Sequence, residues 1–451
     1  MYNYAMAIHT PLSYRSLVIY EIYPRNHSPQ GNFAGVEADL DRIRSLGVDV
    51  LWFMPIHPIG VVARKGRLGS PYSISDYRAV NPEYGTLEDF RRLVEKAHAL
   101  GLKVMIDVVY NHTAHDSVLV RDHPDWFHQD ANGHPFATIP DWSDIIDLRH
   151  PHPDLQEYLI ESLLYWVQQG VDGFRCDVAS VVPLEFWLAA RARVAAVQPD
   201  TIWLAESVHA GFVEARRAAG LTAWSDGEVF SAFDLTYVYD IHPIWQMAVQ
   251  GLTPVARYLE LLRFEDAIYP ANYVKLRCVE NHDQARIQAL APTPDLALAW
   301  TAFEAFNKGA FLIYGGQESA AKHTPTLFDY DPVQWNDYPL QGFLTRLAQI
   351  KKRIAVQEGR FTILAAEPAV QAAWFHPGGS LLGVFNLSAS GGEATVLAAD
   401  GDYEDLISGE IVSVRGGRLP VPRTACILRC DLPGPLRQFY APLLDYYKGP
   451  E

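Results

Sequence analysis

Cysteine is scarce in this chain, with four residues among 451. The four are Cys176, Cys278, Cys426 and Cys430, and no two of them form a Cys-x-x-Cys pair. Chains that depend on disulfides or on a zinc–thiolate centre carry their cysteines in such paired spacings. The sequence therefore predicts neither a disulfide framework nor a zinc site, and it predicts four buried thiols.

Long hydrophobic runs are also missing. The chain has no stretch of about 20 apolar residues, the length that a membrane-spanning helix needs. Residues 1–6 show no basic region followed by an apolar core, which is the pattern of a secretory leader. We therefore expect a cytoplasmic protein that has no membrane partner.

Basic residues are too few to balance the acidic ones. Lys and Arg total 37 against 53 Asp and Glu, and the formal net charge is −16. Binding to nucleic acid requires clustered Lys and Arg that neutralise phosphates, and this chain shows no such clusters. The composition argues against a nucleic-acid partner and favours a neutral or cationic ligand, while it leaves the oligomeric state open.

The order of apolar segments predicts the fold class. Hydrophobic residues make up 49% of the chain and charged residues 20%, a composition typical of a large globular protein. Expected strands alternate with expected amphipathic helices, which indicates a parallel sheet. The strands are expected at 17–23, 48–54, 103–110, 171–179, 201–206, 233–237, 273–280 and 310–314, and helices at 36–46, 87–100, 153–168 and 184–197. Eight strands predict an α/β fold, a (β/α)8 TIM barrel, with its active site where the strands end.

Two regions depart from this alternation. Residues 113–147 are rich in His, Asp, Pro and Trp without a clear period, which predicts a short inserted loop domain after the third strand. From residue 355 the chain turns to short apolar runs separated by Gly, Pro and Asp, which predicts a C-terminal all-β, sandwich-like domain over 355–451. The barrel would then be built from residues 1–112 and 148–354.

The stretch 171–179 carries an unusual pair of charges within an apolar run. Arg175 and Asp177 are two positions apart, so on a strand their side chains point to the same face. A cation beside a carboxylate keeps that carboxylate ionised, which suits a nucleophile. A buried ion pair with no catalytic role would look the same in sequence.

Other expected strands also end in polar groups. Asp107, Asn111 and His112 lie at the end of the third strand, Glu206 at the end of the fifth, and residues 280–283 at the end of the seventh. Each has a structural alternative, since His112 could cap a loop, Glu206 could cap a helix and 280–283 could form a hydrogen-bonded turn. Packing requirements alone would not place all of them at the same end of separate strands.

Taken in order, these segments resemble the four sequence motifs of the α-amylase family, glycoside hydrolase family 13. The matching positions are 107–112, 173–177, Glu206 and 279–283. The resemblance covers nearly the whole chain and implies the same barrel fold. It also implies enzymatic activity on α-glucans.

The resemblance implies a role for each matched residue. Asp177 would be the nucleophile, Glu206 the general acid/base, and Asp283 the carboxylate that holds sugar hydroxyls and stabilises the transition state. Four further residues would position the nucleophile or the sugar: Arg175 beside Asp177, His112 and His282 on sugar hydroxyls, and Tyr72 under the sugar ring.

The chemistry of retaining glycoside cleavage agrees with this assignment, because it needs one ionised carboxylate and one protonated carboxyl. Arg175 is expected to lower the pKa of Asp177. Glu206 has no cation near it in the sequence and is expected to have a raised pKa. A metal-dependent hydrolase on the same barrel would need a closely spaced ligand set, which the sequence does not offer.

The sequence departs from the family pattern at two places. Ser180 and Val181 stand where many α-amylases have the Lys and His that bind leaving-group sugars and help a calcium ion. At the family's calcium position the alignment places Arg149, whereas a shift of two residues would place Asp147 there. We expect no metal and no cofactor, and an Arg-centred hydrogen-bond network in place of calcium.

These observations predict a retaining hydrolase of α-1,4-glucosidic bonds in starch-derived maltodextrins, with an α-glucan oligosaccharide as its partner. A maltodextrin glucosidase, a cyclomaltodextrinase or a 4-α-glucanotransferase on the same scaffold stays open. A barrel that has lost catalysis and serves as a binding module is a remote alternative, because all three acids are present.

Overall fold

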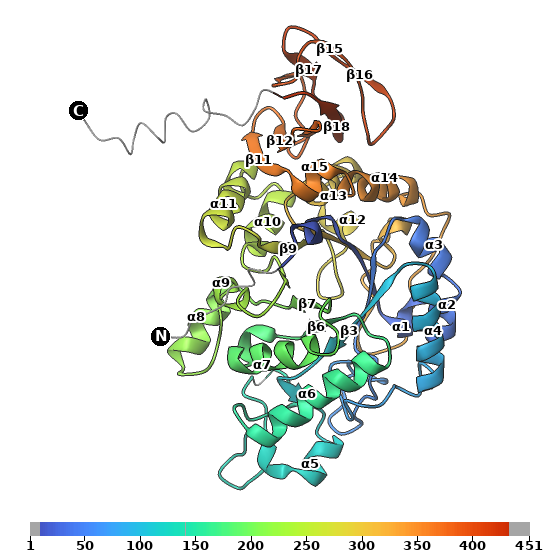
Figure 1. Ribbon diagram of the computed structural model, residues 1–451, viewed down its shortest axis with the longest axis vertical. Coiled ribbons are helices and arrows are strands. Elements are labelled where there is room, and N and C mark those ends of the chain that lie inside the picture. The colour runs from blue at the N-terminus through green and yellow to red at the C-terminus, as the bar shows by residue number, and fades with distance from the viewer. Residues whose placement is uncertain (1–9, 140, 433–451) are drawn as a thin grey trace, which may run out of the picture.

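The central element of the fold is a closed barrel of eight parallel strands (Figure 1). The computed structural model describes residues 10–139 and 141–432. Around the barrel the strands follow the order β1-β10-β9-β8-β7-β6-β3-β2. Their bounds are β1 Val18–Ile22, β2 Val50–Phe53, β3 Lys103–Val108, β6 Gly173–Cys176, β7 Ile202–Ala205, β8 Leu235–Thr236, β9 Val274–Arg277 and β10 Ala310–Tyr314. The predicted TIM barrel is confirmed.

Both faces of these strands are buried, which explains why they read as apolar runs and not as alternating ones. Ile19, Trp52, Met105 and Leu204 belong to the cluster that fills the barrel. Neighbouring positions such as Val104 belong to the larger cluster formed with the surrounding helices. The barrel interior is therefore solid, and polar groups gather where the strands end.

Helices cover the outside of the barrel (Figure 1). They include α3 Leu40–Ser45, α4 Leu87–Ala99, α6 Pro153–Gln168, α7 Leu184–Ala195, α8 Ala210–Ala218, α10 His242–Val249, α11 Val255–Ile268, α13 Pro294–Phe306 and α14 Gln341–Lys351. Capping fixes where several begin: Thr86 and Asp89 form a reciprocal capping box at the start of α4.

The single helix expected over 36–46 is wrong, because the chain forms two short helices there. The first is α2 Phe33–Glu37 and the second is α3. Asp39 lies between them, and its carboxylate accepts hydrogen bonds from Arg42 and contacts His27 at 2.9 Å. The 3.6-residue period of the apolar positions does not reveal the break between the two helices.

Residues after β3 form the short insertion predicted for 113–147. The two-residue strands β4 His112–Thr113 and β5 Ile146–Asp147 pair antiparallel, with His112 opposite Asp147. Between them lies the helix α5 Val118–Asp122. The insertion therefore leaves and rejoins the barrel at one point, beside the end of β3.

The described C-terminal residues from β11 onward, 360–432, are all-β, as predicted, whereas residues 433–451 of the predicted domain lie outside the described residues. A sheet of β11 Arg360–Ala365, β12 Val370–Phe375, β13 Ser380–Phe385 and β18 Ala425–Cys430 is antiparallel throughout. Two separate two-stranded antiparallel sheets accompany it: β14 Glu393–Thr395 with β17 Arg418–Pro420, and β15 Gly401–Glu404 with β16 Ile411–Val414.

This sheet lies against α13 of the barrel (Figure 1). Phe303 and Phe306, on one side of α13, meet Phe385 of β13 at ring-centroid distances of 5.3 and 5.4 Å. Trp374 Nε1 donates a hydrogen bond of 2.8 Å to the carbonyl of Phe306. These aromatic side chains are buried, so the sheet is part of the same core as the barrel helices.

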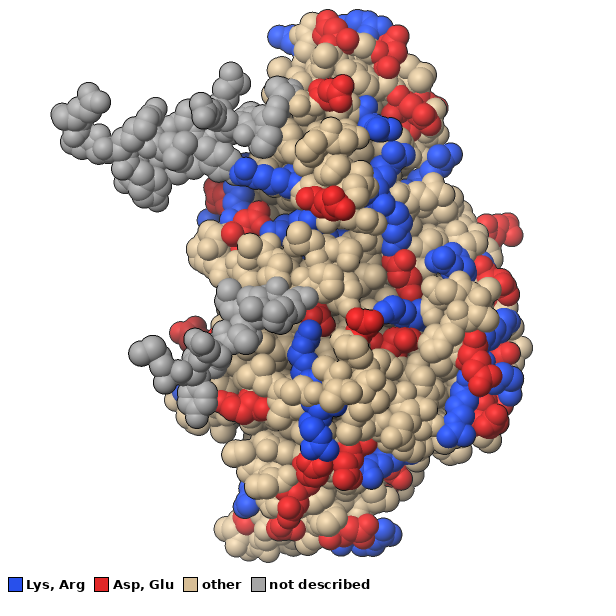
Figure 2. All heavy atoms as spheres, in the orientation of Figure 1, with Lys and Arg blue, Asp and Glu red and all other residues tan. Residues whose placement is uncertain are grey.

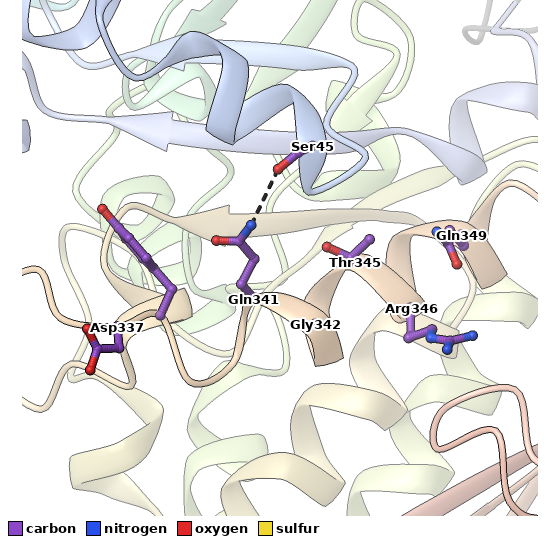
Figure 3. A pocket seen from close by; sticks show the side chains of 8 residues that line it. Ser45, Asp337, Gln341, Gly342, Thr345, Arg346 and Gln349 are labelled. Atoms are coloured by element: carbon purple, nitrogen blue, oxygen red, sulfur yellow. Dashed lines mark hydrogen bonds between the residues drawn. The ribbon is translucent and has the colours of Figure 1, made fainter.

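The outer surface carries clusters of paired charges and a shallow groove. Figure 2 shows acidic and basic side chains gathered together over α2, α3 and α4, where Arg92 pairs with Glu37 and Asp89. Between α3 and α14, Gln341 Nε2 donates to Ser45 Oγ at 3.4 Å, and the polar side chains of α14 follow one another along a shallow groove (Figure 3).

All four cysteines are buried free thiols, as predicted. In the described part of the chain, no helix combines the length and the apolarity that a membrane crossing would require.

Candidate active site

A cavity of about 230 Å³ opens at the carboxyl ends of the barrel strands. Six of the seven residues singled out from the sequence line it: Tyr72, His112, Asp177, Glu206, His282 and Asp283. The seventh, Arg175, lies beneath them and is fully buried. The remaining lining residues are Lys65, Ser70, Trp142, Asp144, Ile145, Val178 and Phe328. The structure thus brings all seven predicted residues to one place.

Arg175, on β6, joins three carboxylates. Its Nη1 donates to Asp107 Oδ1 at 2.9 Å and to Asp177 Oδ1 at 2.8 Å, and its Nη2 lies 2.9 Å from Glu206 Oε2. Its Nε donates to Tyr237 Oη at 3.2 Å. Glu206 has no cation beside it in the sequence, and the structure supplies one, Arg175, from the neighbouring strand.

Burial decides the protonation of these carboxyls more than Arg175 does. Burial raises the pKa of Glu206 to about 7 and that of Asp107 to about 8, against the opposing field of the guanidinium. Burial also raises the pKa of Asp177, although Arg175 acts to lower it. The lowering effect expected of Arg175 is thus present at Asp177, but burial outweighs it and the net change in the pKa is upward.

The backbone after β6 fixes the carboxylate of Glu206. Val178 N donates to Glu206 Oε2 at 2.7 Å. To place that N–H, Val178 adopts a left-handed backbone with φ of 36°, which costs a β-branched residue about 1–3 kcal/mol. Because Oε2 also faces Arg175, the other oxygen, Oε1, is the one left to carry a proton towards a ligand.

His282 lies between two acidic groups. Its Nδ1 contacts Glu21 Oε1, and its Nε2 is 2.8 Å from Tyr72 Oη and 3.2 Å from Asp283 Oδ2. Burial alone would lower the pKa of His282, but Asp283 and Glu21 outweigh it and raise that pKa to about 9. The ring is thus a cation at neutral pH, stacked on Tyr72 with centroids 5.5 Å apart.

His112 lies on the other side of the cavity. Asn111 Nδ2 donates to His112 Nδ1 at 3.2 Å, so the ring proton is on Nε2, which lies 3.9 Å from Asp177 Oδ2. Burial lowers the pKa of His112, so this imidazole is neutral where His282 is charged.

The wall of the cavity includes residues that the sequence did not single out. Trp142, from the insertion, lies 5.6 Å from the His112 ring. Lys65, from the segment after β2, is 2.9 Å from Asp144 Oδ1 and donates to the carbonyl of Asp141 at 2.8 Å. The sequence of the insertion has no period from which its inward-facing residues could be identified.

The two positions that depart from the family pattern do not line the cavity. Ser180 and Val181 lie in a buried 3-10 turn, Ala179–Val181, directly after Val178. The carbonyl of Ser180 accepts a hydrogen bond from Trp224 N at 2.8 Å. They serve as packing beneath the rim.

The expected Arg-centred network at the calcium position is wrong. Arg149 is exposed, and Asp147 is the residue that points inward. Asp147 Oδ2 accepts from Thr138 N and Oγ1 at 2.8 and 2.5 Å, and Oδ1 has no partner in the described part of the chain. One free carboxylate oxygen does not supply the several oxygens, usually from more than one carboxylate, that Ca²⁺ needs.

Removal of divalent metal is therefore expected to leave this enzyme unchanged. After dialysis against EDTA, activity and melting temperature should match those of the untreated protein, because Thr138 already holds Asp147 by two hydrogen bonds. Activity assays and thermal melts with and without added calcium make the comparison. A joint fall in both, reversed by calcium, would show that Asp147 is a ligand.

Comparison with known proteins agrees with this geometry. The family model of the α-amylase catalytic domain matches residues 21–144 and 121–352. The chain belongs to the α-amylase family. A model of the bacterial α-amylase C-terminal domain matches residues 361–428, which cover the C-terminal sheet.

Solved structures of α-amylase family members superpose over most of the chain. An α-amylase from Lactobacillus plantarum is 43% identical, with a TM-score of 0.90, and the match covers 93% of this chain and 100% of that one. A noncanonic maltogenic α-amylase, AmyB, from Thermotoga neapolitana is 33% identical, with a TM-score of 0.83 and coverage of 93% and 100%.

A relative that matches a shorter part of the chain is a transferase by name. An α-1,4-glucan:maltose-1-phosphate maltosyltransferase from Cereibacter sphaeroides is 40% identical over 212 residues, which is 42% of this chain and 36% of the relative. The chain thus spans about a third of the length of that relative, and the match includes only part of the barrel.

Proposed function

We propose that this protein is a retaining hydrolase that cleaves α-1,4-glucosidic bonds in short maltodextrins. The observation that carries the proposal is one cavity lined by Asp177, Glu206 and Asp283, with Arg175 contacting the first two from below. Tyr72 and the two histidines supply an aromatic face and N–H donors, which is the chemistry that a neutral sugar ring needs.

The reaction takes two steps. Asp177 attacks the anomeric carbon while the Glu206 carboxyl gives its proton to the departing glycosidic oxygen, and a covalent glycosyl ester forms. Glu206, now a carboxylate, then takes a proton from water as that water attacks the ester and releases Asp177. Asp283 supplies negative charge beside the positively charged transition state. The pKa of about 7 at Glu206 lets the group serve as acid and as base.

Product analysis tests the proposal. On maltoheptaose and on a cyclodextrin, the enzyme should release shorter maltodextrins, and an NMR time course should show the α-anomer first. Initial release of the β-anomer, or no turnover of any α-glucan, would sink the proposal. The pattern of chain lengths also separates an endo-acting α-amylase from a maltodextrin glucosidase or a cyclomaltodextrinase.

Glucan transfer is the second candidate function. It is favoured by the similarity to the maltosyltransferase, whose name describes transfer of a maltosyl group. In a transferase a sugar hydroxyl replaces water in the second step. Incubation with maltotriose would then give longer as well as shorter products from the outset, whereas a hydrolase gives only shorter ones.

Tyr72 is expected to be a platform for the sugar and not only a packing residue. Its ring lines the cavity and its hydroxyl donates to Asp107 Oδ2 at 3.1 Å. Tyr72→Phe keeps the ring, so we expect it to retain most of kcat/KM. Tyr72→Ala removes the ring and should lose on the order of 10²-fold, the usual penalty for a misplaced substrate.

Steady-state kinetics on the folded fraction, with circular dichroism as a control for folding, check the Tyr72 prediction. If both variants melted earlier by the same amount and kept normal kinetics, Tyr72 would be a packing residue.

A further inference from the structure

Glu21 is a fully buried carboxylate at the end of β1 that the proposed reaction does not use. Its neighbours on the strand, Tyr20 and Ile22, are also fully buried. A charge inside a barrel is costly unless it is paired. The partner comes from the far end of the barrel sequence: Glu21 Oε1 contacts Nδ1 of His282, 261 positions away, while Oε2 has no hydrogen-bond partner among the residues described.

His282 is enclosed by groups from several strands. Glu21 faces its Nδ1, Tyr72 and Asp283 face its Nε2, and the ring of Trp52 meets it edge-on at 5.8 Å. The charged and titratable groups that act on the ring are Glu21 from β1, Tyr72 from the segment after β2, Asp107 from β3, Arg175 from β6, Asp177 directly after β6, and Asp283 on its own segment.

We propose that Glu21 is a positioning residue, whose carboxylate accepts the Nδ1 proton of His282 and thereby fixes Nε2–H as a donor into the sugar-binding cavity. This inference rests on the proposed function, in which His282 contacts the sugar. With Nδ1–H donating to Glu21, a neutral imidazole would have no proton at Nε2, whereas the imidazolium carries a proton on both nitrogens. The negative charge of Glu21 therefore makes Nε2–H available by favouring the charged ring. An acceptor at Nδ1 leaves the ring only one orientation that keeps both nitrogens bonded.

The pairing with Glu21 also keeps a positive charge in an acidic cavity. The charge on His282 acts to lower the pKa of Asp107 and of Asp177. It is present in the folded protein below about pH 9 and is lost as the pH rises through that value. The stabilisation that this charge gives to the folded protein is fully present below the ordinary histidine pKa and is lost as the pH rises through about 9.

NMR titration of the ligand-free enzyme tests the inference directly. With His282→Gln used to assign the resonance, the His282 ring should stay an imidazolium to about pH 9 in the wild-type protein. In Glu21→Gln its midpoint should fall to a lower pH, because the amide carries no charge and can either accept from Nδ1 or donate to it. A His282 that is already neutral at pH 7 in the wild-type protein overturns the inference, whether or not the variant folds.

Kinetics give the second measurement. Glu21→Gln should lower kcat/KM on a maltodextrin by on the order of 10²-fold, because the donor to the sugar is no longer held in place. The matched control is Glu304→Gln: Glu304 is also fully enclosed, accepts from Tyr258 Oη at 2.8 Å and lies on α13, away from the cavity. That control should leave both kcat/KM and the His282 titration unchanged.

The measurements on Glu21→Gln and the assay of the wild-type enzyme on α-glucans test the two proposals separately. An unchanged pH profile and kcat/KM in folded Glu21→Gln would mean that Glu21 is only a structural partner. A wild-type enzyme that cleaves no α-glucan would refute the proposed function, yet the titration of His282 would still decide whether Glu21 holds it.

Discussion

Asp177→Asn is expected to abolish turnover of maltodextrins, with kcat lower by several orders of magnitude. The amide cannot form the glycosyl ester, and Arg175 loses one of the carboxylates that it binds. Glu206→Gln should slow both steps by a comparable factor, because the group that gives and then takes the proton is gone. It should also remove the fall in activity above about pH 7 that deprotonation of Glu206 causes in the wild-type enzyme.

A substrate that needs no acid separates the two acid variants. With α-glucosyl fluoride, Glu206→Gln should still form the covalent intermediate, which mass spectrometry detects as an added glycosyl unit on the protein. Asp177→Asn should show no such adduct. Near-normal turnover by either variant, with its circular dichroism spectrum intact, would overturn the assignment.

Arg175→Gln is expected to cost both stability and activity. The guanidinium is fully buried and faces Asp107, Asp177 and Glu206, so its removal leaves buried carboxyls without a counter-charge. Breaking a buried pair in this way costs about 3–5 kcal/mol of unfolding free energy. Because Arg175 holds down the pKa of all three carboxyls, each pKa should rise, and the acidic side of the pH–activity profile should move to higher pH.

A matched variant separates the two effects of Arg175. Arg277 lies on β9, does not line the cavity and is also almost fully buried. Its guanidinium pairs with Glu265 of α11 at 2.5 Å. Arg277→Gln should lose similar stability in chemical denaturation while the folded fraction keeps its normal pH profile. If Arg175→Gln kept that profile as well, Arg175 would serve the fold alone.

The three acids of the proposed reaction could be predicted from the sequence, whereas Glu21, which contacts His282 from another strand, could not. Asp177, Glu206 and Asp283 each follow a strand within a motif, so their convergence follows from the geometry of a closed parallel sheet. Glu21 belongs to no motif, and its partner is 261 positions away. The sequence of β1 gives no sign that its one carboxylate turns towards His282.

Loops, whose apolar residues follow no helical or strand period, account for other differences between the predictions and the structure. The prediction at Arg149 failed because a loop offers no repeat to fix its alignment, and a shift of two residues brings Asp147 inward instead. The ion pair of Lys65 with Asp144 joins two loops that only the fold brings together. The lowering effect of Arg175 on the pKa of Asp177 could be predicted, but the burial that outweighs it depends on neighbours from other strands.

The packing of helix α13 determines what happens when the C-terminal sheet is removed by truncation. One side carries Trp300, which is fully buried and 5.8 Å from Tyr258 in the helical layer of the barrel. The other carries Phe303 and Phe306, which the C-terminal sheet covers. A barrel shortened before that sheet would present two adjacent aromatic rings to water, so it would associate with other copies of itself. The sheet thus acts as a permanent cap on the catalytic part, and the two should melt in a single cooperative transition.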